Sequence, residues 1–154
     1  MSWDNNNVAC ILVFPPWQRR GLGQILIAAS YHLGRLEGRF GGPERPLSAL
    51  GLRGYIAFWC AEVARSILKS PLKKVVTVQE VSEETYILPE DVVAALKEMD
   101  VVEGRKTAAG NILVNKTKVR AWAAARGISE TPLIDVEAFV TEYEAAEGEN
   151  EEDE

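Results

Sequence analysis

The 154-residue sequence contains one histidine and two cysteines, and these shortages exclude several kinds of site. With His32 as the single histidine, no Ser-His-Asp or Cys-His catalytic set can be assembled from sequence neighbours. His32 itself is expected to have a surface role on a helix. Cys10 and Cys60 are far apart and form no C-x-x-C pair, so the sequence indicates no structural zinc site and a reduced, intracellular environment.

The sequence also lacks long apolar runs, and it has no Lys or Arg after residue 126. No run of 18 or more apolar residues exists and the N-terminus lacks a secretory pattern, so neither a transmembrane helix nor export is expected. All 17 Lys and Arg residues lie at or before Arg126, so residues 1–131, with 13 acids, carry +4. Residues 132–154 carry −10, and we expect them to form an acidic, disordered tail. The mildly basic body suits an anionic ligand.

The first 71 residues predict one strand and two helices. The apolar run Val8–Phe14 is typical of a buried strand, which Pro15 and Pro16 end. A single strand cannot satisfy both of its edges, so its sheet is expected to come from another chain or from the rest of a larger domain. A second helix with an aromatic face is predicted over residues 47–69. The first helix has an apolar stripe made of Leu22, Ile25, Leu26, Ala29, Leu33 and Leu36.

Residues 72–131 predict a second unit. Two short helices joined by a tight turn, the second beginning at Pro89, precede a strand over residues 110–115 and a last helix that Gly127 closes. This order is typical of a winged-helix unit. The second helix, PEDVVAALKEMD, contains four acids and one Lys, which argues against reading of a DNA major groove. A structural or protein-binding role is therefore favoured.

The segment QRRGLG, residues 18–23, lies where the predicted strand passes into the first helix. Its glycines allow backbone N–H groups to approach a ligand closely, and the helix N-terminus and two arginines add positive charge. These features favour a cradle for pyrophosphate, although neither G-x-G-x-x-G nor the P-loop pattern is present. A tight turn with surface arginines is an equally good interpretation.

Two further residues are candidates for chemistry. Glu44 lies between two prolines in a rigid turn, where a carboxylate can act as a general base or can simply be solvated. Cys10 lies in the predicted strand, so a buried core position is expected. A nucleophilic role for Cys10 would need an activating base nearby.

Taken together, these segments resemble the C-terminal half of the catalytic domain of MYST-family histone acetyltransferases. The motifs NNNVACILVFPPWQRRGLGQILIAASYHLG, GGPERPLSALG, GYIAFW and VSEETYILPEDVVAAL follow the family's order and spacing over about residues 3–115. FPPWQRRGLGQ is most similar to the SAS-type fungal branch. The resemblance implies an α/β fold: a partial GNAT-like acetyl-CoA-binding core (strand, pyrophosphate loop, helix) over residues 1–71, then the winged-helix-like segment 72–131.

The resemblance also implies roles for individual residues. Glu44 matches the family's general base, and Cys10 matches its active-site cysteine, either an acyl carrier or a simple neighbour. Ser48 matches a serine near the cofactor. Acetyl-CoA would lie along the strand and on the loop, in contact with Ile11, Leu12, Val13, Gln18, Arg19, Arg20, Gly21, Leu22, Gly23 and Gln24.

The sequence departs from the family at Val13, Ala49 and Ala57, where the family has threonine, aspartate and serine. The family's N-terminal half, with its zinc finger, the pairing strands and an autoacetylated lysine, is not in this sequence. A truncated gene product or a fragment is therefore expected, and a zinc site is not expected.

The implied function is acetyl transfer from acetyl-CoA to a lysine of histone H4 or H3 in the nucleus. The implied partners are a histone tail and subunits of a chromatin-modifying complex, without sequence-specific DNA binding or a membrane. The alternative is a weak or inactive fragment that binds acyl-CoA or protein in such a complex.

Overall fold

The computed structural model describes residues 6–71, 76–106 and 112–139, which form a helix-rich α/β structure. The strands form two small sheets, in which β1 pairs in parallel with β2 and β3 pairs antiparallel with β4. The elements in chain order are β1 (Asn6–Val8), η1 (Pro15–Trp17), α1 (Leu22–Leu36), β2 (Gly42–Pro43), α2 (Ala49–Lys69), α3 (Val78–Thr85), α4 (Pro89–Glu98), β3 (Val102–Lys106), β4 (Ile112–Val114), α5 (Lys116–Ala125) and η2 (Val136–Ala138).

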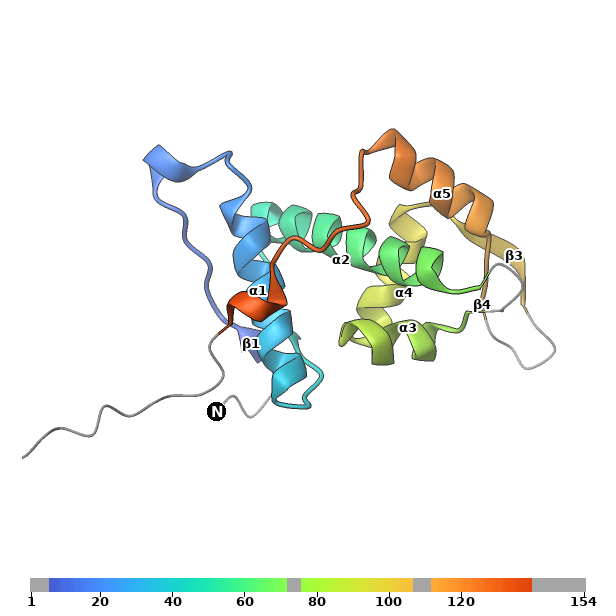
Figure 1. Cartoon of the computed structure of the whole chain (residues 1–154), viewed down its shortest axis with the longest axis horizontal. Helices are drawn as coiled ribbons and strands as arrows, with labels where there is room; N and C mark the ends of the chain where they lie inside the picture. Colours follow the sequence, from blue (N-terminus) through green and yellow to red (C-terminus); the bar gives the residue numbers. More distant parts are fainter. Residues whose placement is uncertain (1–5, 72–75, 107–111, 140–154) are drawn as a thin grey trace, which may run out of the picture.

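Helix α2 is the centre of the structure. It crosses the middle of the molecule, with α1 on one side and α3, α4 and α5 packed along its other half (Figure 1). The Ser48 Oγ accepts a hydrogen bond from the Gly51 N–H at 3.0 Å and so caps its N-terminus. Its apolar side chains, among them the fully buried Trp59 and Ile67, join one continuous core. That core extends through both predicted units, because α2 contributes to each.

Helix α1 packs on α2 through a face that the sequence did not indicate. Ile27, Ala28 and Tyr31 are buried there, and the Tyr31 ring stacks on Phe58 with centroids 5.1 Å apart. The predicted stripe is instead largely exposed, with Leu33 at 49% and Leu36 at 53%. The prediction was wrong because α1 carries apolar residues around most of its circumference, and a helix of that kind does not reveal which face meets the core.

The strand predicted over Val8–Phe14 is also wrong, because the observed strand β1 covers only Asn6–Val8. Strand β1 ends at Val8, and its last contact is the hydrogen bond from the Glu44 N–H to the Val8 carbonyl at 2.9 Å. Residues 9–14 have no regular structure, and Cys10, expected in the core, is exposed. Short β2 offers no further backbone groups to pair with, so the extended chain beyond Val8 has no sheet neighbour among the described residues.

The second unit follows the predicted order of elements. Thr77 and Glu80 form a capping box at the start of α3, and Tyr86, with φ of 60°, makes the tight turn toward α4. Pro89 is the first residue of α4, as predicted. Strand β3 was not predicted, and residues 110–111 of the predicted strand lie outside the described residues. The winged-helix assignment and the GNAT-like core stay predictions.

The chain after α5 returns across α2 to α1 (Figure 1). The Arg65 Nε donates to the Ser129 carbonyl at 2.8 Å, and Ile134 packs against the core. The Phe139 ring then covers His32, with centroids 4.5 Å apart, so His32 is half-buried rather than fully at the surface. Residues 132–139, which the sequence assigned to the acidic tail, therefore lie against the helices, and residues 140–154 lie outside the described residues.

Candidate functional site: an anion-binding loop beside an apolar groove

The loop between β1 and α1 projects from the rest of the molecule (Figure 1). The prolines place a short 3-10 turn, η1, at its tip, and the Gln18 side-chain amide donates to the Val13 carbonyl at 2.8 Å, which closes the loop. Arg19 and Gly21 then adopt positive φ values of 59° and 81°. At Gly21 this left-handed conformation favours glycine and turns the chain into the first turn of α1.

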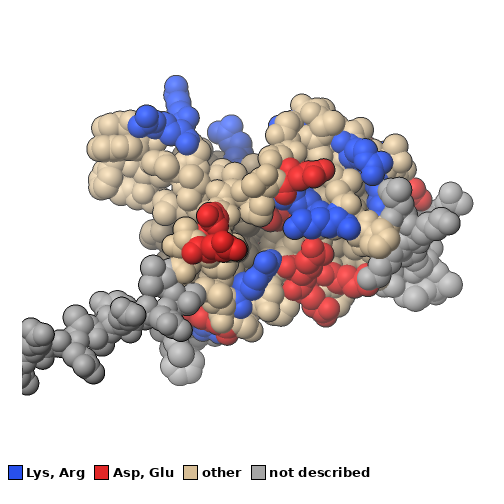
Figure 2. All heavy atoms as spheres, in the orientation of Figure 1, with Lys and Arg blue, Asp and Glu red and all other residues tan. Residues whose placement is uncertain are grey.

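The N-terminus of α1 is suited to an anion. No side chain caps Gly21, and the first turn of α1 contains no acidic residue. The first N–H groups of a helix lack intrahelical partners and carry the positive end of its dipole. Arg19 and Arg20 are exposed and form no ion pair with a described residue. Figure 2 shows Lys and Arg side chains projecting at this end of the molecule, whereas Asp and Glu side chains gather over the middle of the same face.

An apolar groove of about 260 Å³ adjoins the loop between β1 and α1. Its lining comes from the extended chain, from η1 and from the first two turns of α1, and consists of Leu12, Val13, Phe14, Trp17, Leu22, Ile25 and Leu26. Positive charge beside an apolar surface fits a ligand that carries phosphate groups and an apolar arm. The residues present therefore fit the expected acetyl-CoA in chemical type.

Three of the predicted ligand residues have their side chains engaged elsewhere. The Gln24 amide donates to the Gly54 carbonyl at 2.8 Å and joins α1 to α2. Gln18 closes its own loop, and the Ser48 Oγ caps α2. These bonds give each of the three side chains a structural role, whatever part its remaining polar groups play in ligand binding.

The pairing of β1 with β2 brings the two predicted catalytic residues into one region. The Glu44 N–H is bonded to Val8, which lies two residues before Cys10 in the chain. Gly42 and Pro43, which precede Glu44, are buried, whereas the Glu44 side chain is exposed. The structure thus holds the Glu44 backbone firmly and leaves its carboxylate open to solvent and to an approaching substrate.

A partly buried polar cluster lies beside the Glu44 turn, and the sequence did not indicate it. The Arg45 guanidinium pairs with the Asp91 carboxylate of α4, and the Trp59 indole N–H donates to the Tyr31 hydroxyl at 2.8 Å. Burial raises the pKa of Asp91, which the hydrogen bond and charge of Arg45 oppose. Burial also raises the pKa of Tyr31, and it raises that of Tyr55 to about 12. The partners are far apart in sequence, so no local pattern could have revealed them.

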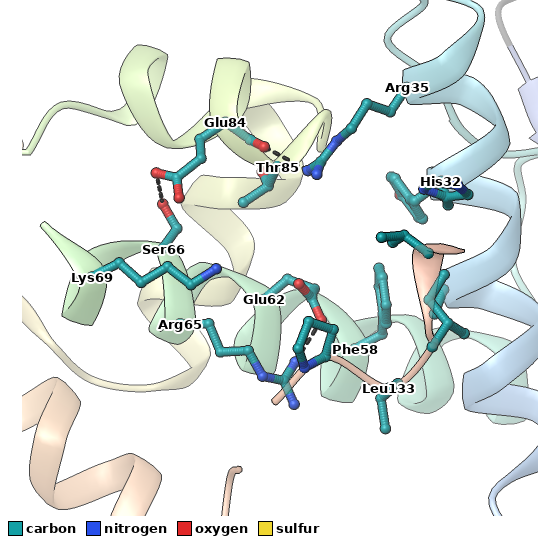
Figure 3. A pocket seen from close by; sticks show the side chains of 15 residues that line it. His32, Arg35, Phe58, Glu62, Arg65, Ser66, Lys69, Glu84, Thr85 and Leu133 are labelled. Atoms are coloured by element: carbon teal, nitrogen blue, oxygen red, sulfur yellow. Dashed lines mark hydrogen bonds and ion pairs between the residues drawn. The ribbon is translucent and has the colours of Figure 1, made fainter. Parts of the chain in front are cut away.

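A second cavity, of about 140 Å³, lies between α1, α2, α3 and the returning C-terminal segment (Figure 3). Its charged side chains largely satisfy one another: Arg65 pairs with Glu62, and the Ser66 hydroxyl donates to Glu84 at 2.7 Å. The Arg35 guanidinium donates to the Glu84 carbonyl at 2.6 Å. This pairing is typical of a structural junction between helices.

Two further properties concern the described residues alone. They contain no cluster of three or more His, Cys, Asp or Glu side chains able to hold a metal ion. Within the same residues, no helix is both long enough and apolar enough to cross a membrane.

The helix-rich α/β fold and the loop at the start of α1 are consistent with an acetyltransferase domain. The sequence profile of the MOZ/SAS family matches residues 1–139, and the chain therefore belongs to this family. The resemblance to MYST-family acetyltransferases is thereby confirmed.

Curated relatives agree with this assignment. Histone acetyltransferase SAS2 of Saccharomyces cerevisiae is 42% identical over 104 residues, which cover 66% of this chain and 31% of that protein. Histone acetyltransferase of the MYST family 1 of Arabidopsis thaliana is 44% identical over 100 residues, covering 65% and 22%. Histone acetyltransferase MOF of Drosophila melanogaster is 41% identical over 102 residues, covering 66% and 12%. The chain thus spans less than a third of the length of these relatives.

Proposed function

We propose that this chain acts in histone lysine acetylation, with acetyl-CoA as the acetyl donor and Glu44 as the general base. The observation that carries the proposal is the uncapped N-terminus of α1, with exposed Arg19 and Arg20 before it and an apolar groove beside it, in a chain of the MOZ/SAS family. The curated relatives are named histone acetyltransferases, which supports a histone lysine as the acceptor.

Glu44 is proposed to prepare the acceptor lysine. A lysine ammonium, with an ordinary pKa of about 10.4, is a poor nucleophile at neutral pH and must lose a proton before it attacks a thioester. The Glu44 carboxylate is exposed on a turn whose backbone is fixed, so it can receive that proton from a peptide that approaches from solvent.

The loop and the extended chain are proposed to hold the donor. Acetyl-CoA supplies the activated acetyl group as a thioester. The first N–H groups of α1 and the two arginines, Arg19 and Arg20, would contact its pyrophosphate. The backbone N–H groups of residues 11–13 form no hydrogen bond with a described residue, so they can donate to the thioester oxygen as negative charge develops on it.

Cys10 keeps both of its proposed roles, an acyl carrier or a simple neighbour of the reacting groups. It is exposed and lies in the chain between the end of β1 and the residues proposed to hold the thioester. The proposed setting is the nucleus, with a histone tail and subunits of a chromatin-modifying complex as partners. The second unit is proposed to serve structure or protein binding rather than sequence-specific DNA binding, because α4 exposes two acids, Glu90 and Glu98, and one Lys, Lys97.

The test is acetyl transfer to histone H4 and H3 peptides by the chain and by its Glu44→Gln variant. We expect the variant to lose a factor of about 100 or more in turnover, in line with the usual contribution of general base catalysis. Glu130→Gln is the matched control, because Glu130 is also exposed and forms no hydrogen bond with a described residue. Equal turnover of Glu44→Gln and the unmodified chain would refute the role of Glu44.

A second candidate function, protein binding without turnover, is supported by the exposed apolar side chains around the loop. Leu12 is 72% exposed, Phe14 64% and Leu50 76%, and such residues commonly mark an interaction surface. Thermal melts with and without acetyl-CoA separate the two functions, because a ligand that binds only the folded state raises the melting temperature. Protein binding alone predicts no shift and no transfer to either peptide.

A further inference from the structure

The turn that carries Glu44 is held from the side of the second unit. Residues 41–43 are buried, and a Cβ added to Gly42 would lie 3.3 Å from the Leu88 Cδ1 atom and 3.5 Å from the Asp91 Oδ2 atom. The start of α4 therefore packs directly against the chain that leads to Glu44. Farther back, the rings of Phe40 and Tyr86 stack with their centroids 5.0 Å apart.

Asp91 is the one acidic side chain at this contact that is buried, with 2% of the residue exposed. It lies in the first turn of α4, where the positive end of the helix dipole favours a carboxylate. Its Oδ1 atom accepts a hydrogen bond from Arg45, whereas its Oδ2 atom has no hydrogen-bond partner among the described residues. A buried carboxylate with so few partners depends on its counter-ion, so Arg45 is its main source of stabilisation.

Arg45 is attached to Glu44 by one peptide bond, so a contact that fixes Arg45 also limits Glu44. The guanidinium is held by Asp91 on one side and lies 5.9 Å from the centre of the Trp59 ring on the other. On the other flank, the Glu44 N–H is bonded to Val8. Contacts on both flanks, one through the half-exposed Arg45 side chain and one through the Glu44 N–H, thus restrict the turn that carries Glu44.

We propose that Asp91 is a positioning residue for the Glu44 carboxylate, acting through Arg45. The inference rests on the proposed function in one respect, since it matters for catalysis only if Glu44 is the base. It gives the second unit a defined part in the reaction: α4 supplies the anchor that sets where the base lies.

Amide hydrogen exchange tests the positioning on the chain itself, without any need for turnover. In Asp91→Asn we expect exchange of the Glu44 amide to accelerate by about tenfold or more, because a hydrogen bond between charged groups is replaced by a weaker one. The amide of Val63, in the core of α2, reports on opening of the whole structure and should keep its rate. Glu90→Gln, the neighbouring exposed acid of the same helical turn, is the control and should change neither amide.

Two results would overturn the proposal. One is an unchanged Glu44 amide in Asp91→Asn, and the other is acceleration of Glu44 and Val63 by the same factor, which a merely structural role would produce. Arg45→Lys keeps the charge at this position and provides a second variant if Asp91→Asn fails to fold. It should also accelerate Glu44 exchange selectively, because an ammonium cannot reproduce the planar geometry of the guanidinium.

A double-mutant cycle connects the positioning to catalysis. Asp91→Asn should lower kcat for acetyl transfer by about tenfold and leave the KM for acetyl-CoA unchanged, because the proposed donor site lies in another loop. In the Glu44→Gln background the same change should have no further effect, since Asp91 acts through Glu44. A full additional loss in that background would refute the proposal. If Glu44→Gln itself changes nothing, the proposed function has failed, and the exchange result still decides whether Asp91 positions the turn.

Discussion

Gly21 offers a sharp test of the loop, because Gly23 provides a matched control two residues away. Gly21 has φ of 81° at the N-cap of α1, whereas Gly23 lies in the helix with no positive φ. A Cβ at either position would meet no atom within 4 Å, so steric contact does not separate the two. The left-handed conformation costs a non-glycine residue about 1–2 kcal/mol, and Gly21→Ala recovers about 0.4–1 kcal/mol from the unfolded chain. Gly21→Ala should therefore destabilise the fold by about 1 kcal/mol, and Gly23→Ala should stabilise it by up to about 1 kcal/mol.

Urea unfolding followed by circular dichroism measures both free energies of unfolding. The free energies of unfolding of the two variants should differ by up to about 2 kcal/mol, which corresponds to a difference in melting temperature of up to about 4–8 °C in a domain of roughly 150 residues. The rise in melting temperature on addition of acetyl-CoA then measures binding of the donor to each variant. Both variants place a methyl group beside the proposed pyrophosphate site, so both should lose most of the ligand-induced shift even though their stabilities differ in opposite directions. Equal stability of Gly21→Ala and the unmodified chain would refute the conformational argument, and a full shift in both would refute the location of the site.

Two further predictions concern the core. In Tyr31→Phe the buried indole N–H of Trp59 loses the acceptor that lies 2.8 Å away, so the free energy of unfolding measured in urea should fall by about 1–3 kcal/mol. Tyr86→Phe is the control: the Tyr86 hydroxyl bonds to no described residue, so the free energy of unfolding should change by no more than about 0.5 kcal/mol. Burial raises the pKa of the Cys60 thiol to about 12, so the folded state keeps a proton that the unfolded state loses above about pH 9. The free energy of unfolding should therefore fall as the pH rises from about 9, by up to about 1.4 kcal/mol per pH unit. If the stability of Cys60→Ala fell just as steeply between pH 9 and 10, the Cys60 thiol would not be the cause.

Elements whose stabilising contacts are local were predicted well. Helix α2 was expected over residues 47–69 and runs over Ala49–Lys69, because its aromatic face and the Ser70-Pro71 pair that ends it are local features of the sequence. The cap at Ser48, which sets its start, was not predicted. Helix α4 begins at Pro89 for a similar reason. The position of the loop before α1 likewise follows from QRRGLG, since the glycines and the start of the helix lie within a few consecutive residues, whereas its binding of an anion stays a prediction.

The polar contacts that shape the Glu44 turn could not be predicted in this way. Arg45 and Asp91 are separated by 46 residues, and Tyr31 and Trp59 by 28, so each pair depends on how the helices pack. Asp91 looks in sequence like an ordinary acid in the first turn of a helix, and only the packing of β2 against α4 shows that it is buried. A carboxylate of that kind is identified from three-dimensional contacts rather than from a motif.

Three of the wrong expectations were inferred in the same way, from apolar sequence patterns. The strand beyond Val8, the burial of Cys10 and the apolar stripe of α1 were all inferred from patterns that record burial, and the stripe residues Leu22, Ile25 and Leu26 line the groove beside the loop. In the part of the chain that the structure describes, no residue covers Leu12, Phe14 or Leu33 fully, and all three are exposed. An apolar pattern at these positions is informative only if another polypeptide surface covers them. For this reason protein binding stays a second candidate function. Measuring whether the chain alone binds acetyl-CoA then distinguishes a donor site that is complete in this chain from one that a partner protein must complete.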